Sequence, residues 1–143
     1  MDSNVAFSAP KEKARAILVV DDDTQVLKFL TRMLGAMGYD PVYQASSAQE
    51  AVEIFKLHER HIGLVVSDFV MPEVSGDRLA LRLRNDKPHL NILLISGNEA
   101  ESLQSAIPLE VGRNFLQKPF TIADIQKTVD RLINPSGAEP VPA

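Results

Sequence analysis

Short runs of consecutive apolar residues constrain the fold of this chain more than any other feature of its sequence. They are AILVV (16–20), GLVVS (63–67), NILLIS (91–96) and the shorter NFLQ (114–117). Runs that stay apolar at successive positions are typical of parallel strands covered by helices on both faces. A fifth segment, PVYQAS (41–46), alternates more and is predicted to be an edge strand.

Segments with the spacing of amphipathic helices separate these runs. Their apolar residues are Val26, Leu30, Met33, Leu34 and Met37; Ala51, Ile54 and Phe55; Leu79 and Leu83; and Ile122, Ile125, Val129, Leu132 and Ile133. One more helix is expected over residues 99–107, but Pro108 removes a backbone donor, so we expect this helix to be short or distorted. The alternation predicts one α/β domain with a parallel sheet between two helical layers.

Composition and length fit one domain and exclude several functions. The chain has 143 residues, no cysteine and a formal net charge of −4. It therefore has no disulfides or thiolate nucleophiles, and its dispersed lysines and arginines do not form the basic stripe of nucleic-acid-binding proteins. Without a long apolar run or a signal peptide, we expect a cytoplasmic protein that binds neither DNA nor membranes directly. We expect a disordered tail over 1–14, a folded domain over 15–134, and a disordered tail or linker over 135–143.

Polar residues occur where the predicted central strands end. They are Asp21, Asp22, Asp23, Asp68, Ser96 and Lys118. Ligands of doubly wound folds bind beyond the carboxyl ends of the strands, so we expect these side chains to meet there. A single aspartate after a strand is most often a turn former or helix cap, and Asp23 is predicted to cap the first helix. This ordinary role does not explain why two further aspartates should converge with Asp68 and a lysine.

A cluster of three carboxylates in a partly buried crevice requires a cation, because like charges repel and each is unfavourable to desolvate. Oxygen ligands without histidine or cysteine favour Mg²⁺, with Mn²⁺ as an alternative, and both ions also bind phosphate oxygens. Lys118 would supply a second positive charge and Ser96 a hydroxyl donor. The sequence therefore predicts a magnesium site that recruits a phosphoryl group.

Four motifs then resemble one family. ILVVDDD, VVSDFVMPEVSG, LLIS and FLQKPF are similar, in this order, to the signatures of the response-regulator receiver domain of bacterial two-component signalling. The resemblance covers residues 16–134 and implies a flavodoxin-like fold with five parallel strands in the order 2-1-3-4-5, counted along the chain, and five helices. It also implies a phosphorelay protein that takes its phosphoryl group from a sensor histidine kinase or a histidine phosphotransfer protein. Such a domain catalyses only its own phosphorylation and dephosphorylation, signals to a downstream effector protein, and is a monomer or a phosphorylation-dependent dimer.

The resemblance implies a role for each matching residue of the metal and acceptor site. Asp68 matches the phosphoacceptor, which also touches the metal. Asp21 and Asp22 match the acidic pair that holds Mg²⁺, and Val70 matches the residue whose backbone carbonyl is a further ligand.

Other matching residues would bind the phosphoryl group and transmit the signal. Ser96 matches the hydroxyl residue and Lys118 the lysine that contact the phosphoryl oxygens, so both count with the acceptor as catalytic, and the Lys118–Pro119 bond is expected to be cis. Ser96 and Phe115 match the switch pair. Phe115 lacks the hydroxyl of the more familiar tyrosine, so any signal through it must come from packing. Gly97 after Ser96 would leave the pocket open, as in receivers attached to hybrid kinases.

Two other functions remain open from the residues alone. A haloacid-dehalogenase-like phosphatase also uses an aspartate after its first strand, and Asp21 and Asp23 fit its Asp-x-Asp-x-Thr motif. However, Gln25 stands where threonine belongs, and Asp68 would have no role. The third possibility is a pseudo-receiver that only binds partners without being phosphorylated.

Overall fold

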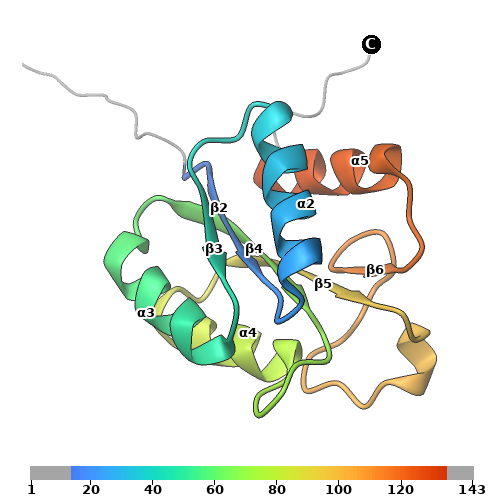
Figure 1. Cartoon of the computed structure of the whole chain (residues 1–143). Helices are drawn as coiled ribbons and strands as arrows, with labels where there is room; N and C mark the ends of the chain where they lie inside the picture. Colours follow the sequence, from blue (N-terminus) through green and yellow to red (C-terminus); the bar gives the residue numbers. More distant parts are fainter. Residues whose placement is uncertain (1–13, 135–143) are drawn as a thin grey trace, which may run out of the picture.

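The computed structural model describes residues 14–134, which form one five-stranded sheet between two layers of helices (Figure 1). The predicted tails at 1–14 and 135–143 lie outside these residues, apart from Ala14. The strands, labelled as in Figure 1, are β2 (Ala16–Val20), β3 (Val42–Ala45), β4 (Ile62–Asp68), β5 (Asn91–Ser96) and β6 (Phe115–Gln117). All neighbouring strands are parallel, in the order β3-β2-β4-β5-β6. This is the predicted order 2-1-3-4-5, with the segment around Val42 at an edge.

Four α-helices cover the sheet: α2 (Thr24–Ala36), α3 (Ala48–His58), α4 (Gly76–Asp86) and α5 (Ile122–Ile133). Helices α2 and α5 lie on one face, and α3 and α4 lie side by side on the other (Figure 1). None of the helices within residues 14–134 is long and apolar enough to cross a bilayer.

Strand β2 explains why the central strands are apolar at every position. All five of its residues are at most 2% exposed. Ile17 and Val19 pack with the apolar residues of α2 and α5, whereas Leu18 and Val20 pack with those of α3 and α4. Successive side chains of a strand point to opposite faces, so a sheet with helices on both sides needs an apolar residue at each position.

The expectation of five helices was wrong, because no α-helix forms between β5 and β6. This segment, residues 97–114, contains only a three-residue 3₁₀ turn, η1 (Ala100–Ser102). Turn hydrogen bonds such as the one from the amide of Arg113 to the carbonyl of Glu110 pair part of its backbone. The side chain of Asn114 pairs another part, since it accepts from the amide of Glu110 at 2.8 Å and donates to the carbonyl of Pro108 at 2.8 Å. Pro108 cannot donate a helical hydrogen bond, and the Asn114 side chain satisfies backbone groups that a helix would otherwise pair.

Candidate functional site

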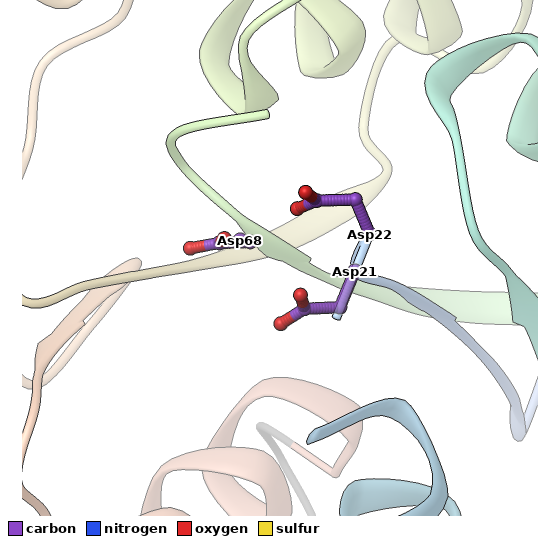
Figure 2. Close-up of side chains that lie close together, drawn as sticks. All are labelled: Asp21, Asp22 and Asp68. Atoms are coloured by element: carbon purple, nitrogen blue, oxygen red, sulfur yellow. The ribbon is translucent and has the colours of Figure 1, made fainter. Parts of the chain in front are cut away.

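Three carboxylates meet where β2 and β4 end (Figure 2). Asp21 and Asp22 follow β2, and Asp68 is the last residue of the adjacent strand β4. One carboxylate oxygen of each lies within 4.8 Å of the others. Asp21 is only 3% exposed, Asp68 is half-buried and Asp22 is exposed, so the cluster opens to solvent on one side.

The backbone around β2 holds the first acid of the cluster in place. The amide of Asp21 donates to the carbonyl of Ala45 at 3.1 Å, and its Oδ1 accepts from the amide of Asp23 at 2.8 Å. The side chain of Asp23 accepts from the amides of Gln25 and Val26 at 2.9 and 3.4 Å. Asp23 is therefore the N-cap of α2, as predicted, and its carboxylate is engaged by the helix.

Burial and mutual repulsion make the cluster electrostatically unfavourable. Burial, and then the charge of Asp21, raise the pKa of Asp68 to about 6, against the opposing effect of Lys118. Burial also raises the pKa of Asp21, which the amide of Asp23 and the charge of Lys118 partly offset. Two unit charges 4.8 Å apart repel by about 3 kcal/mol at an effective dielectric constant of about 20. A bound cation would relieve this repulsion.

Lys118 and Ser96 border the cluster from the ends of β6 and β5. The amide of Lys118 donates to the carbonyl of Ser96 at 2.8 Å, and the Lys118–Pro119 bond is cis, as expected. No ion pair to Lys118 within 4.0 Å is found among residues 14–134, although its charge acts on two of the aspartates. The hydroxyl of Ser96 is buried and accepts from the amide of Asn98 at 3.0 Å. The serine hydroxyl donates no hydrogen bond to any described residue, so it can donate one to a bound anion.

Val70 and Phe115 lie in contrasting environments. Val70 is 57% exposed, and its carbonyl accepts no hydrogen bond from the part of the chain that the structure describes. This carbonyl is free to bind a metal or water. Phe115 is fully buried and belongs to the apolar cluster beneath α3 and α4, together with Ile107.

Two further residues belong in the description of the site. At Gly97, directly after Ser96, no atom other than those of its chain neighbours lies within 4 Å of where a Cβ would be, so a side chain would find open space there. Sequence reasoning missed Asp77, a carboxylate only 2% exposed at the start of α4. The only signal for Asp77 was its place directly after Gly76 in the VVSDFVMPEVSG motif, since an acid in the first turn of a helix is ordinary.

The fold and the site define a flavodoxin-like domain with an acidic centre beyond the carboxyl ends of its strands. Residues 17–130 match the family described as the response regulator receiver domain, and the chain belongs to this family. Receiver domains are signalling modules of two-component systems, generally non-enzymatic. They bind Mg²⁺ through acidic residues and interact with histidine kinases and effectors.

Individual relatives include both a response regulator receiver protein and a sensor kinase. The chain is 30% identical over 121 residues to the response regulator receiver protein CpdR of Brucella abortus (strain 2308), covering 83% of this chain and 97% of CpdR. It is 32% identical over 117 residues to the sensor kinase CckA of the same organism, covering 82% of this chain but only 12% of CckA. A solved response regulator receiver protein from Sinorhizobium medicae WSM419 has a TM-score of 0.72 and 31% identity, covering 85% of this chain and 95% of that one.

Proposed function

We propose that this chain is a phosphorelay receiver in which Asp68 accepts a phosphoryl group in a Mg²⁺-dependent reaction. The observation that carries the proposal is the meeting of three carboxylates from two adjacent strand ends, with oxygens within 4.8 Å. The charge of Lys118 acts on Asp21 and Asp68 across the same space. A purely structural turn would need none of these features, whereas the acid cluster suits a metal ion and the nearby lysine suits an anion bound beside it.

The residues present fit a magnesium ion. Asp21, Asp22 and Asp68 would hold it through carboxylate oxygens, and Val70 through its free carbonyl. All of these are hard oxygen ligands, which suits Mg²⁺ and also Mn²⁺. When bound, the ion neutralises charge on the acid cluster and on the oxygens of the incoming phosphoryl group.

Asp68 would act as the nucleophile. Its pKa of about 6 leaves it mostly ionised at pH 7.5, as attack requires. A carboxylate oxygen of Asp68 forms a bond to phosphorus while the P–N bond of a phosphohistidine donor breaks, and the imidazole nitrogen keeps the electron pair. The ammonium of Lys118 and the hydroxyl of Ser96 would stabilise negative charge on the phosphoryl oxygens. Water would later attack the same phosphorus, releasing phosphate and restoring the carboxylate.

Signalling would use Ser96 and Phe115 as its switch pair. Phosphorylation would offer the free proton of Ser96 a new acceptor and so favour one of two conformations. Phe115 shares an apolar cluster with Ile107, so a movement of Phe115 would reach the segment 97–114 through packing. A phenylalanine without a hydroxyl is suited to this kind of readout.

The proposed donor is a sensor histidine kinase or a histidine phosphotransfer protein, and the output goes to an effector protein. A candidate donor face is the outer surface of α2, where Lys28, Phe29 and Arg32 are exposed and Phe29 reaches 53%. A phosphorylation-dependent dimer remains a prediction, which light scattering with and without beryllofluoride, a phosphoryl mimic, would test.

The phosphatase alternative has less support than the receiver. It needs Asp23 as a free acid, but the carboxylate of Asp23 caps α2. The family match and the inclusion of Asp68 in the acid cluster both favour the receiver.

Mass spectrometry after incubation with acetyl phosphate and Mg²⁺ tests the proposal. We expect the intact mass to increase by one HPO₃ unit, the adduct to map to Asp68, and EDTA to suppress it. Asp68→Asn should abolish labelling, whereas Asp86→Asn, a matched change at an exposed acid of α4, should label normally. An adduct on Asp21 would support the phosphatase instead. No adduct at all would support a pseudo-receiver.

A further inference from the structure

Asp77, the second residue of α4, is a buried carboxylate outside the acidic cluster. It accepts a hydrogen bond from the amide of Ala106 at 2.6 Å through Oδ2. Its Oδ1 accepts from the hydroxyl of Ser75. An acid that only complements the dipole of a helix can remain in water, whereas burial of Asp77 is tolerated because both oxygens have partners.

On one side, the start of α4 is fastened to the backbone of the proposed acceptor. The amide of Gly76 donates to the carbonyl of Phe69 at 2.7 Å. A Cβ atom at Gly76 would overlap the carbonyl oxygen of Asp68, so the two backbones are in direct contact. A change in the backbone at Asp68 would therefore move the residues that carry Asp77.

On the other side, Ala106 lies in the middle of the irregular segment 97–114. This segment begins directly after Ser96 and ends directly before Phe115, and these two residues are the proposed switch pair. Ile107, next to Ala106, is buried in the same apolar cluster as Phe115. The bond between Asp77 and Ala106 therefore joins the acceptor backbone to the centre of the segment that the switch pair brackets.

We propose that Asp77 is a positioning residue that holds segment 97–114 at Ala106 and transmits changes at Asp68 to it. The transmission rests on the proposed function. The tether, which is the hydrogen bond from the Ala106 amide to Asp77, does not. In a helix, the backbone would fix this segment internally. Here the segment has only a 3₁₀ turn, so a bond from a neighbouring element can determine where its centre lies.

The test uses NMR spectra of the full ¹⁵N-labelled chain and three variants: Asp77→Ala, Asp77→Asn and Asp86→Ala. Asp77→Ala removes the acceptor of the Ala106 amide, Asp77→Asn retains an oxygen that can accept, and Asp86→Ala removes an exposed acid from the same helix. Without ligand, the Ala106 amide proton should shift upfield in Asp77→Ala, with amide exchange about tenfold faster. Asp77→Asn should retain most of the wild-type shift, and Asp86→Ala all of it.

Addition of Mg²⁺ and beryllofluoride then tests transmission. In the wild type we expect shifts both in residues 69–76 and in residues 98–111. In Asp77→Ala the response of 69–76 should persist while that of 98–111 falls by at least half, and Asp77→Asn should restore it. If Asp77→Ala does not fold, Ala106→Pro removes the donor at an exposed position and should give the same loss.

Three results would overturn the inference. They are an unchanged Ala106 amide in Asp77→Ala, an undiminished response of 98–111 in that variant, or an equal loss in Asp86→Ala. If the wild type did not respond at residues 69–76, the proposed acceptor function would fail instead. The tether would then be judged on the Ala106 amide alone.

Discussion

Replacement of Asp68 by asparagine should stabilise the metal-free protein while abolishing phosphorylation. Burial and the charge of Asp21 raise the pKa of Asp68 from its ordinary 3.8 to about 6. Since about 1.4 kcal/mol accompanies each pH unit, the ionised carboxylate lowers the free energy of unfolding by up to about 3 kcal/mol. Asp68 is half-buried, so solvent screening reduces this to about 1–2 kcal/mol. Asparagine has nearly the same size as aspartate but no charge, so Asp68→Asn should raise the free energy of unfolding by the same amount, about 1–2 kcal/mol.

The effect has a defined pH dependence. A carboxyl group whose pKa is higher in the folded than in the unfolded state favours folding below its unfolded pKa, and this contribution is lost as pH rises. For Asp68 the loss should develop between about pH 4 and pH 6 and be complete above pH 6. The advantage of Asp68→Asn should therefore be small at pH 4 and full at pH 7.5.

Urea unfolding followed by circular dichroism in EDTA, at several values from pH 4 to pH 8, measures this difference. With a slope of about 2 kcal/mol per molar urea, the midpoint at pH 7.5 should rise by about 0.5–1 M. Asp86→Asn, at an exposed position, should leave the midpoint nearly unchanged. If Asp68→Asn were no more stable than the wild type at pH 7.5, or gained equally at every pH, the assigned repulsion within the cluster would be wrong.

Three more changes test the metal site, the lysine and the core. Mg²⁺ at one hundred times its dissociation constant should raise the free energy of unfolding by about 2.7 kcal/mol. Asp22→Asn should weaken Mg²⁺ binding, so the same stabilisation should require a higher Mg²⁺ concentration. If calorimetry gave this variant the Mg²⁺ affinity of the wild type, Asp22 would not be a ligand. Lys118→Ala should slow labelling by acetyl phosphate at least about tenfold with Mg²⁺ affinity within a few-fold, and wild-type rates would contradict its role. Tyr39→Phe should lower the free energy of unfolding by about 1–2 kcal/mol, because the hydroxyl of the buried Tyr39 donates a hydrogen bond to Asp130. Tyr43→Phe, in an edge strand, is the control and should have little effect in the same urea assay.

The central sheet was predictable because burial on both faces leaves a direct mark on the sequence. The predicted bounds of β2 and β5 agree with the structure, and β4 extends one residue further at each end than its predicted apolar run. Asp68 ends β4 as a member of the strand, since the last residue of a central strand can place a polar side chain beyond the core. The strand-end rule for ligand sites then located the three carboxylates without any knowledge of side-chain geometry.

For the segment 97–114, the sequence predicted only that a helix would be short or distorted, and not what structure would replace it. Pro108 indicated that a helix would be difficult there, but the contacts that replace the helix join residues far apart in sequence. The bond from Asp77 to Ala106 spans 29 positions. The two bonds of Asn114 depend on its amide reaching back to Glu110 and Pro108. Such side-chain-to-backbone bonds have no periodicity, so no pattern of apolar residues predicts them.

The same carboxylate is subject to opposing demands from folding and from function. An ionised Asp68 beside Asp21 destabilises the metal-free fold, yet attack on phosphorus requires that charge, and the repulsion it creates adds to the affinity for a cation. The chain limits the penalty locally, because the amide of Asp23 binds one oxygen of Asp21 and the charge of Lys118 faces both acids. Replacement of Asp68 should therefore abolish phosphorylation and raise the free energy of unfolding. Removal of the Asp23 cap should lower stability by about 1 kcal/mol, because the start of α2 loses its cap. The free energy of unfolding should therefore rise when Asp68 is replaced and fall when Asp23 is replaced, although the two acids are only 45 positions apart in sequence. This opposite response would distinguish the acceptor from the residue that caps the helix and supports Asp21.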